Sequence, residues 1–207
     1  MIPLIHEMKG KRIVIFGGGD VGFRKAAYFY PEAEVVVVSR RHLEEIQRMG
    51  VLCIEMDLNT ASEDDIKKVI GDSVLIVAST SDRTLNNRIG VFAKELGIHF
   101  NNADGEPGDI IIPSKISGEN YIIAISTGGK SPGMSRYIRL LIEEKCPNID
   151  RMIELQNEVR EYLKTTIPEQ KKRNEILRKI IYDDKVWSEL EINKDFAIKY
   201  IKGKYLQ

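Results

Sequence analysis

The chain has 207 residues, enough for one domain or one and a half with a sizeable core. Lys and Arg together number 31, as do Asp and Glu, so the net charge is zero and no overall field favours binding to nucleic acid or to a membrane surface. A signal peptide is not expected, because the first residues lack its basic and long apolar regions. A membrane span is not expected either, because no apolar run approaches the roughly 18 residues that a span needs. Cys53 and Cys146 are far apart, which favours two reduced thiols in a cytoplasmic protein.

A glycine-rich motif follows the first predicted strand, the apolar run 13–16. The next six residues, Gly-Gly-Gly-Asp-Val-Gly, fit the pattern G-x-G-x-x-G. Gly17 permits a sharp turn, Gly19 lets the backbone approach a pyrophosphate, and Gly22 lets the next helix pack closely on the strand. The N–H groups at the helix start then hold the phosphates. The residues predicted to contact the pyrophosphate are Gly17, Gly19, Asp20, Val21 and Gly22.

Strands and helices alternate through the first half of the chain. Further strands are predicted at 34–38, 51–55, 74–78 and 98–100, and helices at 23–30, 42–49, 62–70 and 84–96. This rhythm predicts an α/β fold with a Rossmann-type doubly wound parallel sheet. The glycine motif in this βαβ context favours nucleotide binding over the alternative of a plain tight turn.

The composition changes after residue 104. Strands at 110–113 and 121–126 are expected to form a hairpin around the turn 117–120. Ser131 is predicted to cap a helix that starts at Pro132 and runs to residue 145, and the remainder is charged and helical in pattern. The predicted organisation is a dinucleotide-binding domain at 1–112, a dimerisation region at 113–147 and a helical domain at 148–207.

The end of the second strand bears on cofactor selectivity. An acid there binds the adenosine ribose, whereas an arginine accommodates a 2′-phosphate. Here the sequence reads Ser39-Arg40-Arg41, which taken alone leans toward NADP, and the alternative is two solvated arginines at the start of a helix. These three residues are predicted to contact the adenosine end of the cofactor.

The fourth and fifth strands end at the sheet edge where open α/β folds bind ligands. Ser79, Thr80 and Asp82 follow one strand and are predicted to contact the nicotinamide side of the cofactor. Asp104 follows the other, where an acid could take a proton from a substrate. The segment around Asp104 is also turn-forming in composition, so a purely structural turn is the alternative.

A second anion-binding helix start is predicted at Gly128-Gly129-Lys130-Ser131. The sequence nearly matches a P-loop, but Ala124 replaces the leading glycine. This loop, with Arg136 and Arg139 one turn apart on the following helix, is expected to contact an anionic ligand or the other subunit. The alternative is a capped surface helix with solvated arginines. His6, His42 and His99 are dispersed, and no metal site is predicted.

Several segments together resemble the precorrin-2 dehydrogenase / sirohydrochlorin ferrochelatase family, the dehydrogenase portion of siroheme synthase. The resemblance covers roughly residues 1–150. The matching segments are Gly17–Gly22 with Arg24, Lys25 and Ala26; Ala78–Asp82 with Thr84, Asn86 and Arg88; Asn101–Asp104; Ile112–Ser114; and Ala124–Pro132 with Arg136 and Arg139.

This resemblance implies NAD-dependent oxidation of precorrin-2 to sirohydrochlorin by a homodimer, and iron insertion in some members. The family's catalytic aspartate falls on Asp104. The tetrapyrrole substrate carries eight carboxylates, which suits the cationic residues around the second helix start. Substrate contacts are expected at Asn101, Lys130, Ser131, Arg136 and Arg139. The expected cofactor is NAD, with NADP as the alternative. The alternative functions are a non-catalytic Rossmann protein that binds dinucleotide or tetrapyrrole, and a P-loop enzyme.

Overall fold

The computed structural model describes residues 1–206 and divides into two compact units, Met1–Ile112 and Pro113–Gln207. The boundary follows residue 112, a few residues after the change in composition at residue 104. The further division predicted at residue 147 stays a prediction. Among the described residues, no helix has both the length and the apolar character needed to cross a membrane.

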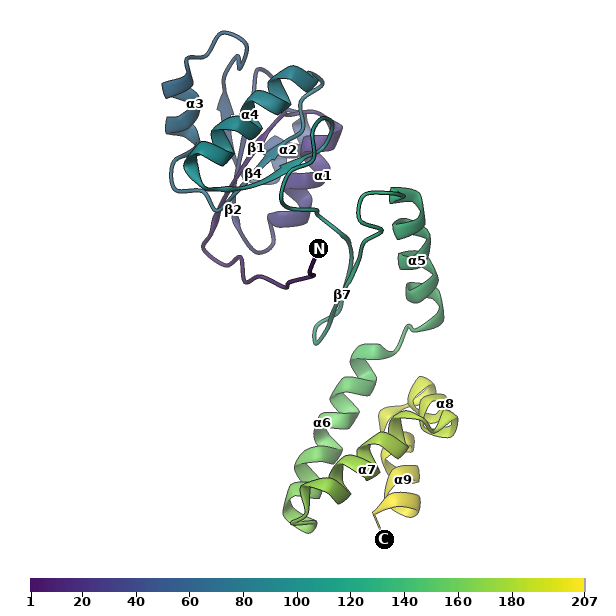
Figure 1. Ribbon diagram of the computed structural model, residues 1–207. Helices are drawn as coiled ribbons and strands as arrows, with labels where there is room; N and C mark the ends of the chain where they lie inside the picture. The colour runs from purple at the N-terminus through teal and green to yellow at the C-terminus, as the bar shows by residue number, and fades with distance from the viewer. Residues whose placement is uncertain (207) are drawn as a thin grey trace. The chain divides into compact units, whose positions relative to one another are not determined.

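The first unit is a five-stranded parallel sheet in the order β3-β2-β1-β4-β5, which confirms the predicted α/β fold (Figure 1). The strands are β1 (Arg12–Phe16), β2 (Glu34–Ser39), β3 (Leu52–Glu55), β4 (Leu75–Ala78) and β5 (His99–Asn102). The helices are α1 (Asp20–Phe29), α2 (Glu44–Arg48), α3 (Glu63–Ile70) and α4 (Arg83–Leu96). The chain winds outward from β1 to β3, returns to β4 beside β1, and continues outward to β5.

Helices cover both faces of this sheet. The side chains of Ile13 and Ile15 pack with α1 and α2, whereas Val14 and Phe16 face α3 and α4, and all four are fully buried. A strand buried on both faces has no polar side to present, which is why β1 and β4 are uninterrupted apolar runs.

The ends of α3 and α4 follow local sequence signals. The Ser62 hydroxyl accepts a hydrogen bond from the Asp65 N–H at 3.1 Å, as predicted for the start of α3. The Asp82 carboxylate accepts from the N–H groups of Thr84 and Leu85 and so caps α4. Gly97 ends α4 in the left-handed conformation, with φ of +67°.

The second unit begins with a two-stranded antiparallel hairpin, β6 (Ser114–Ser117) and β7 (Ile122–Ile125). The hairpin and its turn were predicted, but the first strand lies at 114–117 and the prediction of 110–113 is wrong. Ile110 instead donates its N–H to the Phe100 carbonyl, and its own carbonyl accepts from the Asn101 amide. Its side chain packs against the core of the first unit, which accounts for its apolar character.

The hairpin turn is tied to a later helix. The Asp150 carboxylate accepts hydrogen bonds from the N–H groups of Glu119 at 3.1 Å and Asn120 at 2.8 Å. A Cβ at Gly118 would collide with the same carboxylate and with the Tyr121 ring, so a larger residue there would displace these side chains. Along the chain, the hairpin is followed by helix α5 (Pro132–Lys145) and then by the helices α6 (Ile149–Thr166), α7 (Gln170–Ile181), α8 (Asp184–Ile192) and α9 (Lys194–Tyr205).

The last four helices share an apolar core of their own. It contains Leu155 and Leu163 of α6, Ile180 of α7, Leu190 of α8 and Ile201 of α9, all fully buried. The helical tail therefore folds around its own apolar residues, as its periodicity predicts.

A single carboxylate connects the end of α9 to the start of α8 through hydrogen bonds. Asp183 accepts hydrogen bonds from the Lys204 ammonium at 2.8 Å and the Tyr205 hydroxyl at 2.7 Å, and its side chain is only 11% exposed. Burial opposes ionisation of this carboxyl, but the hydrogen bonds from Lys204 and Tyr205 outweigh it and lower the pKa of Asp183 to about 2.

Replacement of Asp183 by Asn is expected to lower the free energy of unfolding at pH 7 by about 1–3 kcal/mol, because a charge-assisted hydrogen-bonded pair is lost. A lowered folded-state pKa stabilises the protein above the unfolded value of about 3.9, and this contribution is lost as the pH falls through about 2. Urea unfolding at pH 7, 4 and 2.5 should therefore show the difference between wild type and Asp183→Asn shrinking with acid. Asp184→Asn, at an exposed neighbouring position, is the control. An equal change in the free energy of unfolding for both substitutions would contradict a stabilising role of the Asp183 hydrogen bonds.

Candidate functional site

The glycine turn between β1 and α1 is held by backbone contacts that exclude larger residues. Gly17 has a φ of +118°, and a Cβ there would lie 2.5 Å from the Ser79 carbonyl oxygen. A Cβ at Gly22 would collide with the Gly17 carbonyl. The turn and the first turn of α1 are therefore packed against each other and against the end of β4, in the roles predicted for Gly17 and Gly22.

Gly19 differs from its neighbours because no atom lies within 4 Å of where its Cβ would be. It is the N-cap residue of α1, and no side chain caps the first N–H groups of that helix. An open space beside uncapped N–H groups at a helix start fits a pyrophosphate, which needs donors and close backbone approach. Asp20 and Val21 form the first two positions of α1 at the same place.

Gly18 has a role that sequence reasoning missed. A Cβ on Gly18 would collide with the Arg41 carbonyl and lie 2.9 Å from the Ser39 Cβ, and the Gly18 carbonyl accepts from the Leu43 N–H at 3.0 Å. Gly18 thus joins the glycine turn to the end of β2. In the sequence, the only sign of this role is that Gly18 is a glycine at a position where the dinucleotide motif allows any residue.

The predicted adenosine-end residues lie at the carboxyl end of β2. Ser39 is the last residue of the strand and half-buried, while Arg40 and Arg41 are exposed. Arg40 Nη1 lies 3.9 Å from Asp57 Oδ2, and Asp57 follows the neighbouring strand β3. An acid therefore stands at this edge, although β2 itself does not supply it.

The residues predicted to contact the nicotinamide side also hold the fold. The Ser79 hydroxyl is buried and donates to the Phe16 carbonyl at 3.0 Å, which ties β4 to β1. The Asp82 carboxylate is used as the cap of α4. The Ser79 hydroxyl and Asp82 Oδ1 thus already have protein partners, and Thr80 is the half-buried member of the three.

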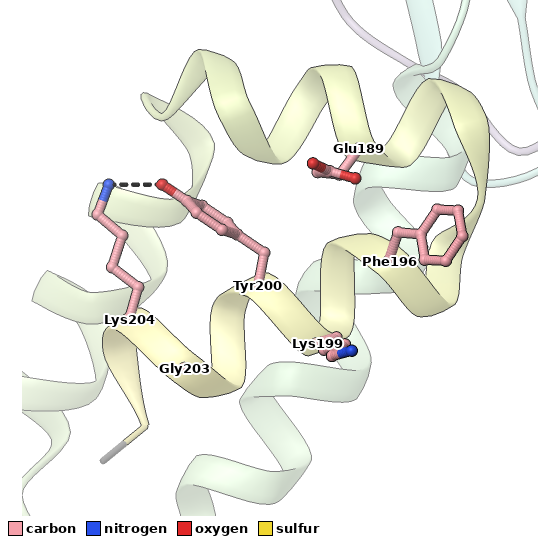
Figure 2. Close-up of a pocket in the computed structure, with 6 residues that line it drawn as sticks. All are labelled: Glu189, Phe196, Lys199, Tyr200, Gly203 and Lys204. Atoms are coloured by element: carbon pink, nitrogen blue, oxygen red, sulfur yellow. Dashed lines mark hydrogen bonds between the residues drawn. The ribbon is translucent and has the colours of Figure 1, made fainter.

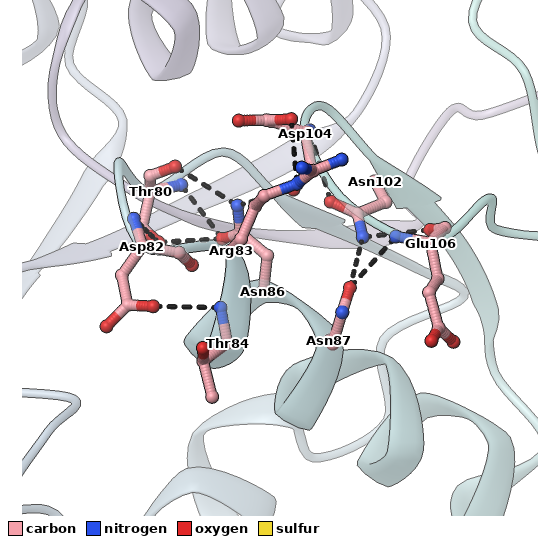
Figure 3. A network of polar contacts seen from close by, with 9 residues as sticks. All are labelled: Thr80, Asp82, Arg83, Thr84, Asn86, Asn87, Asn102, Asp104 and Glu106. Carbon is pink, nitrogen blue, oxygen red and sulfur yellow. Dashed lines mark hydrogen bonds and ion pairs between the residues drawn. The ribbon is translucent and has the colours of Figure 1, made fainter.

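A polar network links the end of β4 to Asp104 (Figure 3). Its centre is Asn86 of α4, which is fully buried and hydrogen-bonded both to Thr80 and to the Asp104 carbonyl. The Ala103 N–H donates to the Ala78 carbonyl at 2.8 Å, so the chain leaves β5 alongside the end of β4. Asp104 and Thr80 are brought to the same edge of the sheet.

The Asp104 carboxylate is accessible. Its side chain is 67% exposed, and its Oδ1 lies 3.3 Å from Arg83 Nε, which is 70% exposed. The carboxylate is therefore accessible to a substrate and is not buried within a closed turn. Arg83 was not identified from the sequence as a partner of Asp104. The sequence feature that could have indicated it is its position directly after Asp82, at the start of α4.

Asn101 lies on the opposite face of β5 from Asn102 and is buried. Its amide donates to the Ile110 carbonyl at 2.8 Å, and its Oδ1 has no hydrogen-bond partner in the described residues. In this arrangement Asn101 anchors the segment after Asp104. His99, which was not expected to bind metal, pairs with Asp109 at 2.7 Å and anchors the same segment.

The remaining predicted substrate-binding residues belong to the second unit. Ser131 caps α5 by accepting from the Met134 N–H at 3.3 Å, as predicted. Arg139 forms two hydrogen bonds with Glu143, at 2.8 and 3.0 Å. Within residues 1–206, no side-chain ion pair involves Lys130 or Arg136, and both are exposed.

The P-loop alternative is not supported by the strand that precedes this loop. A P-loop connects a strand of a parallel sheet to its helix. Here the preceding strand, β7, belongs to the antiparallel hairpin.

A pocket of the second unit lies between α8 and α9 (Figure 2). It has a volume of about 570 Å³ and is lined by Glu189, Phe196, Lys199, Tyr200, Gly203 and Lys204. None of the predicted site residues lines it, so it takes no part in the candidate site. Within the described residues, no cluster of three or more His, Cys, Asp or Glu side chains is suited to hold a metal ion.

Comparison with known proteins agrees with this geometry. The family described as "Putative NAD(P)-binding" matches residues 4–114. A protein of Methanosarcina barkeri named "Precorrin-2 dehydrogenase" is 39% identical over 90% of this chain and 85% of its own length. A protein of Methanocaldococcus jannaschii named "Putative precorrin-2 dehydrogenase" is 34% identical over 92% of this chain and 95% of its own.

A solved structure titled "SirC, precorrin-2 dehydrogenase" superposes with a TM-score of 0.72 at 23% identity, covering 98% of this chain and all of that one. This likeness shows a shared fold. The NAD(P)-binding match extends over the glycine turn and the strand ends described above. The chain belongs to the precorrin-2 dehydrogenase family of NAD(P)-binding oxidoreductases.

Proposed function

We propose that this chain oxidises precorrin-2 to sirohydrochlorin in siroheme biosynthesis, with NAD⁺ as the hydride acceptor and Asp104 as the general base. The observation that carries the proposal is an exposed carboxylate, Asp104, at the carboxyl edge of a sheet whose first turn fits a pyrophosphate. This arrangement occurs in a chain 39% identical to a precorrin-2 dehydrogenase.

The oxidation removes a hydride and a proton from the macrocycle. A bound nicotinamide dinucleotide supplies the hydride acceptor, and the Asp104 carboxylate accepts the proton, so NADH and one proton are the co-products. The residues that would hold the dinucleotide are the glycine turn with Asp20 and Val21, the Ser39–Arg41 segment, and the strand end with Ser79, Thr80 and Asp82. Insertion of Fe²⁺ into the product, implied for some family members, stays a prediction.

Cationic side chains of the second unit would bind the substrate carboxylates. Lys130 and Arg136 are the available candidates because neither is engaged by a carboxylate of the described residues, whereas Arg139 would exchange Glu143 for a substrate carboxylate. Ser131 and Asn101 are the further proposed contacts.

A homodimer is supported by an apolar stripe on α5. Met134, Tyr137 and Leu141 recur at helical spacing and are 47%, 57% and 40% exposed, and only Ser135 of this helix is buried. An exposed apolar stripe of this kind is typical of a protein–protein contact. We therefore assign it to a second copy of the chain. The cytoplasmic location, consistent with the free Cys53 and Cys146, is proposed with it.

Replacement of Asp104 by Ala is expected to lower kcat by about 10²–10⁴-fold, because proton transfer loses its base, while dinucleotide binding survives. The measurement is an anaerobic assay of NADH and sirohydrochlorin formation, with and without Fe²⁺, alongside titration with NAD⁺. Glu106→Ala, a nearby exposed acid, is the control. Full activity of Asp104→Ala would remove Asp104 from the mechanism, and an inactive wild type would favour the non-catalytic binding protein.

The wild type is expected to prefer NAD⁺ to NADP⁺ because Asp57 faces Arg40 at the adenosine end. Asp57→Asn should free Arg40 to bind a 2′-phosphate. The ratio of kcat/KM for NADP⁺ to that for NAD⁺ should therefore rise by about 2–5-fold, which corresponds to the energy of an exposed ion pair. Steady-state kinetics with both cofactors measure the ratio, and Asp64→Asn on α3 is the control. An unchanged ratio would show that Asp57 takes no part in selectivity.

Leu141→Glu is expected to raise the dissociation constant of the dimer at least about tenfold, because two charges would be buried at the contact. Sedimentation over a concentration series measures the change. Lys145→Gln alters the net charge equally at the exposed end of the same helix and should leave the dimer intact. A wild type that is monomeric at all concentrations, or an unaffected Leu141→Glu, would refute this contact.

A further inference from the structure

Asn86 is a buried amide that no catalytic assignment explains. It lies on α4, the helix that begins beside Asp104, and its side chain is completely inaccessible to solvent. A buried amide must find hydrogen-bond partners, since an unsatisfied polar group costs about 1–3 kcal/mol. Its partners lie at the ends of two different strands.

The amide of Asn86 is fully satisfied. Its Oδ1 accepts from the Thr80 N–H at 3.1 Å and the Thr80 hydroxyl at 2.7 Å. Its Nδ2 donates to the Thr80 carbonyl and to the Asp104 carbonyl, both at 3.1 Å. An amide has two donors and two acceptor sites, so all four are used. The orientation is determined, because a backbone N–H can only donate and carbonyls can only accept.

The carboxylate of Asp104 has no comparable support of its own. Apart from the exposed Arg83 guanidinium, no side chain of the described residues is recorded in contact with it. Its position depends on the backbone, which is held by the Asn86 amide at the carbonyl and by Asn102 Oδ1 at the N–H, 3.2 Å away. Of these two anchors, only Asn86 also reaches the strand end at Thr80 (Figure 3).

We infer that Asn86 is a positioning residue for the dehydrogenation, which sets the Asp104 backbone at a defined separation from Thr80. The inference rests on the proposed role of Asp104 as the base and of Thr80 on the nicotinamide side. Asn86 touches neither substrate nor cofactor. A base misplaced by about 1 Å can cost about 10²-fold in rate, so the link between the two strand ends acts on the chemical step.

Asn87 provides a matched control. It is the next residue of α4, and its Oδ1 accepts from the Asn102 amide at 3.2 Å and the Glu106 N–H at 2.9 Å. It therefore anchors the same loop without bonding to Asp104 or Thr80. Asn87→Ala reports the effect of loosening the loop, and Asn86→Ala reports the effect of releasing the base.

The experiment compares Asn86→Ala, Asn87→Ala and Asp104→Ala in the anaerobic precorrin-2 assay. Rates are expressed per dinucleotide-binding site, determined by NAD⁺ titration, so that unfolded protein does not count. Asn86→Ala is expected to lower kcat about 10–100-fold with the Kd for NAD⁺ changed less than about threefold. Asn87→Ala should lower kcat less than about threefold. If Asn86→Ala does not fold, Asn86→Ser is measured with the same expectation.

The outcomes separate the two proposals. If Asp104→Ala is inactive and Asn86→Ala has normal kcat per site, or loses no more than Asn87→Ala, the positioning role is refuted and the role of Asp104 stands. A lower thermal midpoint with unchanged kcat would likewise refute it, because Asn86 would then be only structural. If Asp104→Ala keeps full activity, the proposed base fails and the positioning inference fails with it.

Discussion

The burial of β1 on both faces is the constraint on which the first unit depends. An apolar strand with no polar side needs a neighbour along each edge and helices over each face, and β2, β4 and the four helices supply them. The strand order then reverses beside β1. Open α/β sheets bind ligands at such a reversal because two successive connections leave in opposite directions there. The glycine turn lies at this point, next to the end of β4.

Close packing at that point leaves little room for variation. Ser79, whose hydroxyl bonds to Phe16, stands against the backbone of Gly17, and Gly22 packs on Gly17 in turn. A larger side chain at Gly17 would collide with the end of β4, and one at Gly22 would collide with the Gly17 carbonyl. Gly19 alone faces open space, so the same turn is rigid where it contacts the protein and accessible where a phosphate would lie.

Much of this could be predicted from residue patterns. Apolar runs, Ser62 as a cap and Gly97 as a helix end depend on local chemistry, and the structure has them as expected. The error at 110–113 arose because apolar residues at that position pack on a distant core, which a local pattern cannot distinguish from a strand.

The site shows the same division. Residue types predicted Asp104 at the sheet edge, but patterns do not show which polar atoms are already used. Asp82 was expected to contact the cofactor, and its carboxylate caps α4. The part played by Asn86 depends on two loops far apart in the sequence meeting over one helix, and this became visible only in the folded chain.

The carboxylate of Asp150 has a consequence for where the chain can be divided. It belongs to the first turn of α6, yet it accepts hydrogen bonds from two backbone N–H groups of the hairpin turn. A cut at residue 147 would separate the turn from its only recorded acceptor for those groups among the described residues. Truncation of the helical tail would thus remove both hydrogen bonds and loosen the hairpin turn, so the hairpin needs the start of α6 to keep its geometry.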